Sequence, residues 1–156
     1  GTTGIHGLDL LGRRVFADGA LVALADEFKT AIADARGTGL PSAWLEQFEL
    51  AIATVATLTA LLARRGQAGE AEFMVRHSAD YLDLFSTLVV AWQWLRQATV
   101  AARALGAANA DDRNFYEGKL CAAQYWFATE LPRIDHLVRL CQEGEDSYAR
   151  MRPEWF

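Results

Sequence analysis

The chain has 156 residues, enough for one compact domain with a substantial hydrophobic core. Its composition is 52% hydrophobic and 22% charged, which is typical of globular proteins and excludes an intrinsically disordered chain. The formal net charge of -5 argues against nucleic acid or an anionic membrane surface as a partner, because both attract a basic face.

Apolar residues recur at spacings of three and four along the chain, and no alternating strand pattern occurs. A short first helix is predicted over Thr3 to Leu11, with Gly12 ending it. A second helix is predicted from Gly19 to Arg36. A third is predicted from Ser42, as its N-cap, to Arg65, where Gly66 breaks the pattern.

The longest predicted helix covers Glu70 to Leu105. It is apolar on nearly every side from Leu84 to Leu95, so it is expected at the centre of a helical assembly. That apolar run is too short to span a bilayer, and no membrane span is predicted.

A fifth helix is predicted to begin at Asp111 or Asp112, either of which would cap it, and its apolar stripe runs from Leu120 to Cys141. Pro132 lies inside this stripe and removes a backbone donor, so the helix must kink near Ala128 or restart there. The sequence therefore predicts an all-α fold, an antiparallel bundle of about four long helices with a short N-terminal helix.

The residues that could bind a metal do not form a known pattern. His6, His77 and His136 lie on three separate segments, and none has a glutamate three residues before it, as a di-iron bundle requires. The group Asp135, His136 and Cys141 lacks the spacing of a zinc site. No metal site is predicted.

Two further local features are expected to be structural. Cys121 and Cys141 are predicted to be buried free thiols in a reducing cytoplasm. His77, Asp80 and Tyr81 can meet across one helical turn and are expected to form a hydrogen-bonded cluster rather than an acid/base pair.

Aromatic residues are frequent on the two longest predicted helices, where they are expected to pack between helices, with an interface as the alternative for some of them. They are Trp92, Trp94, Phe115, Tyr116, Tyr125, Trp126 and Phe127. Trp94 looks exposed, and the tail ends in Trp155 and Phe156, which together suggest an adhesive face.

One segment carries a specific resemblance. Gly1 to Arg14 resembles the part of acyl-CoA dehydrogenases that reads Glu-Gly-Thr-x-x-Ile-Gln and continues into Leu-Asp-Leu-x-Gly-Arg, with His6 where glutamine is usual. More loosely, Ala79 to Phe85, Phe115 to Leu120 and Thr129 to Pro132 look like the helical extension of a longer subgroup of that family.

This resemblance implies two parts. Residues 1–14 would be the end of the catalytic and FAD-contact segment, and residues 15–156 a C-terminal helical bundle extension. The catalytic base of the family, a glutamate, would immediately precede Gly1, so no catalytic residue is expected in this chain. Gly1 would lie next to the substrate thioester, and Thr2, Thr3 and Gly4 would contact FAD.

The resemblance also implies the function of the whole enzyme, the FAD-dependent α,β-dehydrogenation of acyl-CoA thioesters in fatty acid β-oxidation. Electrons would pass to an electron-transferring flavoprotein, and this fragment would be inactive alone. An acyl-CoA oxidase and a non-catalytic helical dimerisation scaffold are the alternatives. A cytoplasmic homo-oligomer, most simply a two-fold dimer, is expected.

Overall fold

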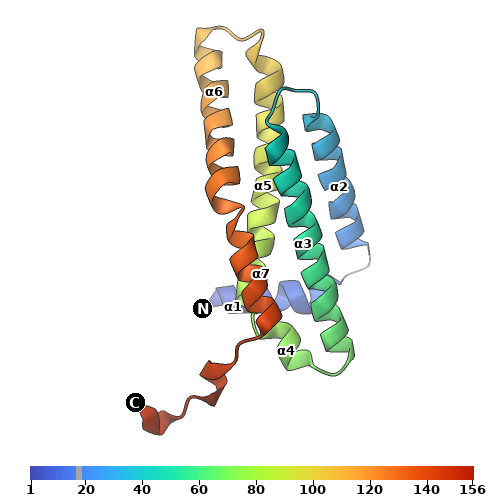
Figure 1. The fold of residues 1–156 in the computed structure, drawn as a ribbon, viewed down its shortest axis with the longest axis vertical. Coiled ribbons are helices and arrows are strands. Elements are labelled where there is room, and N and C mark those ends of the chain that lie inside the picture. The colour runs from blue at the N-terminus through green and yellow to red at the C-terminus, as the bar shows by residue number, and fades with distance from the viewer. Residues whose placement is uncertain (17–18) are drawn as a thin grey trace.

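The computed structural model describes residues 1–16 and 19–156, and every regular element among them is helical. The four long helices are α2 (Ala20–Ala35), α3 (Ser42–Gln67), α5 (Ser78–Leu105) and α6 (Ala110–Tyr125). The chain reverses direction from each of these helices to the next, and α7 (Arg133–Glu143) continues the direction of α6 (Figure 1). The predicted all-α antiparallel bundle with a short N-terminal helix is confirmed.

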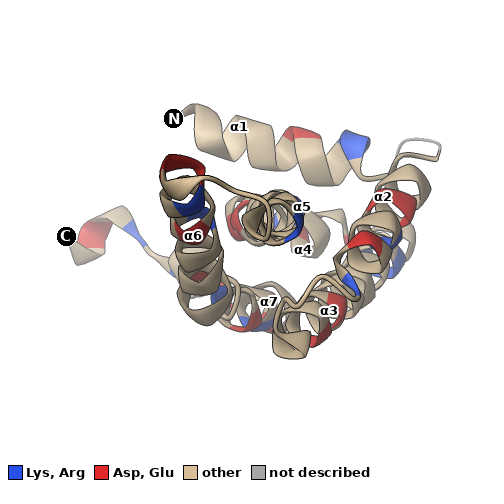
Figure 2. Cartoon of the chain, turned by 90° about the horizontal axis from the view of Figure 1, so that it is seen from above, with Lys and Arg blue, Asp and Glu red and all other residues tan. Residues whose placement is uncertain are grey.

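α5 is the central helix, as its apolar run predicted. Seen from above, α6, α7, α3 and α2 lie around it, and α1 (Thr2–Asp9) closes the remaining side (Figure 2). Buried side chains follow one another along α5 at each turn: Tyr81, Leu84, Leu88, Ala91 and Leu95. Full burial of a leucine-sized side chain stabilises a fold by about 1.5–3 kcal/mol, so this stripe is a major source of the cohesion of the bundle.

α3 is long and apolar enough to cross a membrane by length and composition alone. In the structure it packs inside the bundle, where it buries Phe48, Val55, Leu58 and Leu62. Its N-terminus differs from the prediction, since Ser42 is the first helical residue and Pro41 occupies the cap position. Its end also differs, because the helix continues beyond Arg65 through Gly66 to Gln67.

The predicted helix from Glu70 to Leu105 is wrong in its first third. It is divided into α4 (Ala71–Val75) and α5, with Arg76 and His77 between them. The division is fixed by the end of α7: Arg76 Nη1 donates to the Gly144 carbonyl at 2.7 Å, and His77 Nε2 lies 3.1 Å from the Glu145 carbonyl. Contacts between segments far apart in sequence therefore decide where α5 begins.

The second half of the chain starts with a different cap from the one predicted. Asn109, rather than Asp111 or Asp112, is the N-cap of α6, and its side chain accepts from the Asp112 backbone N–H at 2.9 Å. The effect of Pro132 is confirmed, because α6 passes into a π-helical turn, η2 (Trp126–Glu130), and α7 restarts after the proline.

The tail projects away from the lower end of the bundle (Figure 1). It contains two single 3-10 turns, η3 (Ser147–Arg150) and η4 (Pro153–Trp155). Its side chains Met151, Trp155 and Phe156 are 50%, 60% and 93% exposed, so the arm presents apolar groups to its surroundings.

Candidate functional site

The segment that carries the predicted site forms α1, which lies across the lower end of the bundle against the start of α5 (Figures 1 and 2). Gly7 makes this approach possible. A Cβ atom on Gly7 would lie 2.7 Å from the Ser78 carbonyl carbon and 3.1 Å from the Ala79 nitrogen, too close for a side chain. Sequence reasoning missed this role, because the partner backbone lies about seventy residues further along the chain.

The helical conformation that starts with α1 does not stop at Gly12, contrary to prediction. It passes directly into a π-helical turn, η1 (Leu10–Arg14). The wider turn keeps Leu11 facing the bundle, where it is fully buried, and Val15 follows it into the core. Leu11 and Val15 therefore anchor the segment at one end, while Gly7 seats its middle.

The predicted substrate- and cofactor-adjacent residues lie at the opposite end of α1. Gly1, Thr2, Thr3 and Gly4 are all exposed, and Cβ atoms on Gly1 and Gly4 would meet nothing within 4 Å. Gly1 is the N-cap, so Thr2 is the first helical residue rather than a cap. Thr2 and Thr3 are both exposed at this helix start, so a ligand that approaches it can reach their hydroxyls.

The N–H groups of the first helical turn point out of the same end. They have no acceptor within the helix, and the helix dipole adds partial positive charge there. His6, which stands where glutamine is usual, is exposed one turn further along. The site therefore offers hydroxyl and backbone donors on an uncrowded surface.

Asp9 holds the two arginines that follow it. Its carboxylate pairs with Arg13 and accepts from Arg14 Nε at 3.1 Å. These bonds, that of Arg14 foremost, lower the pKa of Asp9 below its ordinary value. The cluster brackets η1 at the surface, which indicates a structural role for the Leu-Asp-Leu-x-Gly-Arg part of the motif.

The proposed cluster of His77, Asp80 and Tyr81 is half right. His77 Nδ1 lies 2.8 Å from an Asp80 oxygen, as predicted. Tyr81 points instead into the core, where its hydroxyl is 2.7 Å from Thr59 Oγ1 on α3. Burial raises the pKa of Tyr81 to about 12, so it stays protonated and is not an acid/base candidate near neutral pH.

The two cysteines are free thiols in different environments. Cys141 is buried, and its thiol lies 3.7 Å from the His77 carbonyl oxygen. Burial raises the pKa of Cys141 to about 12, which keeps it an inert thiol. Cys121 is exposed, so the prediction that both are buried is wrong for that residue.

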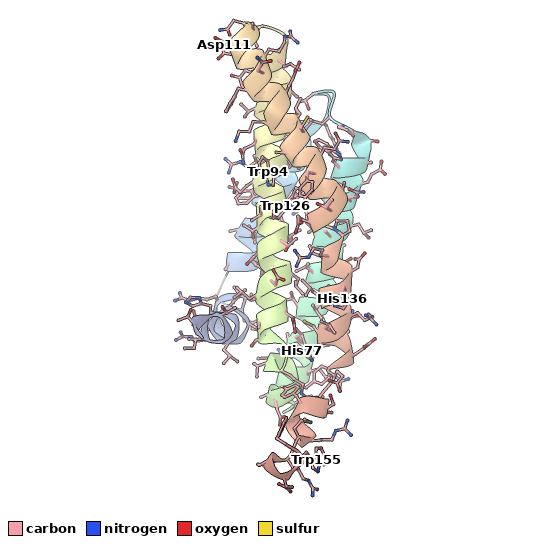
Figure 3. All side chains as sticks on the ribbon, turned by 90° about the vertical axis from the view of Figure 1, so that its left-hand side faces the viewer. His77, Trp94, Asp111, Trp126, His136 and Trp155 are labelled. Atoms are coloured by element: carbon pink, nitrogen blue, oxygen red, sulfur yellow. The ribbon has the colours of Figure 1, made fainter. Side chains whose placement is uncertain are left out.

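The three histidines lie apart from one another. His77 is the N-cap residue of α5, His136 is on α7 (Figure 3), and His6 is on α1. Among residues 1–16 and 19–156, no group of three His, Cys, Asp or Glu side chains is placed to hold a metal ion.

The aromatic residues divide between packing and exposure. Phe127 stacks on Trp44 with ring centroids 5.2 Å apart, and Trp92 packs edge-on to Phe28 at 5.7 Å, as predicted. Phe115 and Tyr125 are 61% and 62% exposed, so these two rings do not pack in the core. Trp94, expected to be exposed, is half-buried beneath the Lys119 ammonium, 5.6 Å from its ring.

An apolar groove of about 250 Å³ opens between α2, α3 and α5. Its walls include Phe28, Val55 and Leu88, and Phe16 lies at its edge. Because Gly1 to Gly4 do not line it, this groove is separate from the candidate site.

The fold and these contacts define a helical domain that buttresses an exposed Gly-Thr-Thr-Gly helix start. The family described as "Acetyl-CoA dehydrogenase C-terminal like" matches residues 20–152, and the chain belongs to this family. The match begins at α2, so the motif of residues 1–14 lies outside it.

A relative named as a broad-specificity linear acyl-CoA dehydrogenase, from Mycobacterium tuberculosis, is 28% identical over 142 residues. The alignment covers 86% of this chain and 23% of the relative, so the chain spans less than a quarter of that protein's length. The similarity supports the C-terminal acyl-CoA dehydrogenase domain that residues 1–14 suggested.

Proposed function

We propose that this chain is the C-terminal part of an FAD-dependent acyl-CoA dehydrogenase, which introduces a double bond between Cα and Cβ of acyl-CoA thioesters. Residues 1–14 end its catalytic segment, and residues 15–156 are the helical extension. The observation that carries the proposal is the family match over residues 20–152, preceded in the same chain by an exposed Gly-Thr-Thr-Gly helix start.

The residues present fit an anionic flavin cofactor. Thr2 and Thr3 present exposed hydroxyls, and the helix start supplies backbone N–H donors in a favourable dipole. Gly1 and Gly4 leave room for close approach, since nothing lies within 4 Å of their Cβ positions. Bound FAD would accept the hydride that leaves the substrate β-carbon.

The proposal assigns these roles within the chain. Gly1 lies beside the substrate thioester, and the glutamate base immediately precedes it. Thr2, Thr3 and Gly4 bind and orient FAD. The Gly7 contact with α5, together with buried Leu11, holds this helix start in one position, which the alignment of thioester and flavin requires.

The partners of the whole enzyme are acyl-CoA and an electron-transferring flavoprotein, and its state is a homo-oligomer, most simply a dimer. The exposed Trp155 and Phe156 support subunit contact through the arm. The free thiols support a reducing cytoplasm.

The test is Thr2→Val in the longer protein of which this chain is part. Valine keeps the shape of threonine but removes the hydroxyl. A hydrogen bond to a charged group contributes about 1.5–3 kcal/mol, so the FAD dissociation constant is expected to rise by at least about tenfold.

The matched control is Thr57→Val, because the Thr57 hydroxyl is exposed and bonds only to its own helix at the Ala53 carbonyl. It is expected to leave flavin affinity unchanged. If Thr2→Val lowers the melting temperature and leaves FAD affinity intact, Thr2 has a structural role and the cofactor assignment is wrong.

A further inference from the structure

A second hollow lies on the bundle away from Gly1 to Gly4, between the upper halves of α5 and α6. Its volume is about 420 Å³, and eight residues line it. From α5 come Gln93, Arg96, Gln97, Val100 and Ala101; from α6 come Phe115, Tyr116 and Lys119. Nothing in the candidate site uses these side chains.

The hollow contains two cations that lack acidic partners. Arg96 lies over the Trp92 ring at 5.1 Å, and Lys119 lies over the Phe115 ring at 5.5 Å. Lys119 also donates to Gln97 Oε1 at 3.0 Å. Within the described ranges neither cation forms an ion pair, although most other cations of this acidic chain do. On its other side Arg96 borders a hollow that Glu27 and Asp34 also line, and it forms no ion pair with either carboxylate.

The acidic residue on this part of α6 has another partner. Glu117 follows Tyr116 on α6, but it pairs with Arg113, one turn towards the start of the helix, at 3.7 Å. Among the described residues, Arg96 and Lys119 therefore stay without an ion pair on a protein whose net charge is -5.

The remaining walls suit a flat aromatic group. Phe115 is 61% exposed and meets Tyr116 edge-on, with centroids 5.6 Å apart, so much of its ring is accessible for stacking beside the Lys119 ammonium. The Gln93 amide offers both donor and acceptor to the edge of a base. Val100 and Ala101 form an apolar wall.

We propose that this hollow binds a phosphorylated nucleotide through an adenosine diphosphate group. The base stacks on Phe115 and meets the glutamine amide, while Arg96 and Lys119 bind the diphosphate. The volume lies in the range of small-molecule sites, ~300–1,000 Å³. A stable protein interface uses roughly 20–30 residues per side, many more than line this hollow, which favours a small ligand. The inference does not rest on the proposed dehydrogenase function.

Calorimetric titration of the chain with ADP tests the proposal, alongside adenosine and inorganic pyrophosphate. ADP is expected to bind at least about tenfold more tightly than either half, because both base and phosphate contribute. Lys119→Met, Arg96→Gln and Phe115→Leu are each expected to weaken ADP binding by about tenfold.

Two matched controls separate the site from general surface effects. Arg64→Gln removes another exposed cation, at the end of α3, and Tyr125→Leu removes an aromatic ring as exposed as Phe115. Both are expected to leave ADP affinity unchanged. Circular dichroism of each variant is the check that it is folded.

Coenzyme A, which carries the same group, distinguishes the source of the ligand. Coenzyme A that displaces ADP and binds more tightly assigns the site to the larger molecule. ADP binding that coenzyme A does not displace assigns it to a free nucleotide, and either result supports the shared chemistry. Equal affinity for ADP and pyrophosphate, no ADP binding, or binding that the three variants do not change overturns the proposal. So does a change in oligomeric state on Phe115→Leu without nucleotide binding, which would make the face a protein interface.

Discussion

The hydroxyl pair between Tyr81 and Thr59 offers a sharp test of how the bundle core is held together. Both side chains are buried, with Tyr81 0% and Thr59 5% exposed. The Thr59 hydroxyl donates to the Val55 carbonyl at 2.7 Å. Its single hydrogen is therefore used, and Tyr81 must be the donor in the 2.7 Å contact between the two hydroxyls.

This direction makes the two single substitutions unequal. Tyr81→Phe removes the donor to Thr59, but the Thr59 hydroxyl keeps its hydrogen bond to the Val55 carbonyl. The free energy of unfolding is therefore expected to fall by about 0.5–1.5 kcal/mol. Thr59→Val keeps the side-chain volume but strands the Tyr81 hydroxyl in a dry core, at a cost of about 1–3 kcal/mol. The double variant removes the stranded donor and is expected to be no less stable than Thr59→Val alone.

Urea unfolding of the four proteins at neutral pH, followed by circular dichroism, gives the required free energies. The reasoning is refuted if Tyr81→Phe is the more destabilising single change, or if the two losses simply add in the double variant.

Three further predictions follow from individual residues. Burial raises the pKa of Tyr81 and Cys141 to about 12 from ordinary values of 10.0 and 9.0, so their contribution to stability is full below pH 9 and is lost as pH rises towards 12. Unfolding free energy measured across that range should fall, and Tyr81→Phe should reduce the fall; an unchanged slope in this variant would contradict it. Cys121 should react with a thiol reagent in the folded chain, whereas Cys141 should react only after unfolding; simultaneous reaction would place both thiols wrongly. Gly144→Ala forces an alanine to a φ of 60° with its Cβ against the Phe73 ring, and should lower the free energy of unfolding by at least about 1–2 kcal/mol. The control Gly118→Ala, in an open helical position, should raise it by about 0.5–1 kcal/mol. Equal shifts of the denaturation midpoint in the two variants would contradict this prediction.

Apolar spacing was sufficient to predict the bundle, because the helices are long and each buries a continuous stripe. The central place of α5 followed from Leu84 to Leu95, and the restart after Pro132 followed from the missing donor. These features depend on residues within one helix, so the local sequence contains the information.

Several features that the sequence did not predict depend on partners far along the chain. The break at Arg76 and His77 contains no glycine or proline; it is fixed by carbonyl groups of Gly144 and Glu145, each 68 residues away. The partner of Tyr81 is 22 residues away on α3. Contacts of this kind have no periodicity, and only the fold brings them together.

The candidate site also combines features that the local sequence predicts with one that depends on a distant partner. The motif around Gly1 to Gly4 indicated which residues could face a cofactor, and the structure leaves them exposed at a helix start. The reason that this start is held in place, the close approach of Gly7 to Ser78, could not be read from the motif.

The most direct test of the central claim is the visible absorption spectrum of the longer protein that contains this chain, recorded anaerobically before and after addition of a linear acyl-CoA. If this chain ends an FAD-dependent acyl-CoA dehydrogenase, the purified protein carries oxidised flavin, and the flavin absorption bleaches when the thioester is added. A protein that binds no flavin, or a flavin whose spectrum does not change with any linear acyl-CoA, would contradict the account.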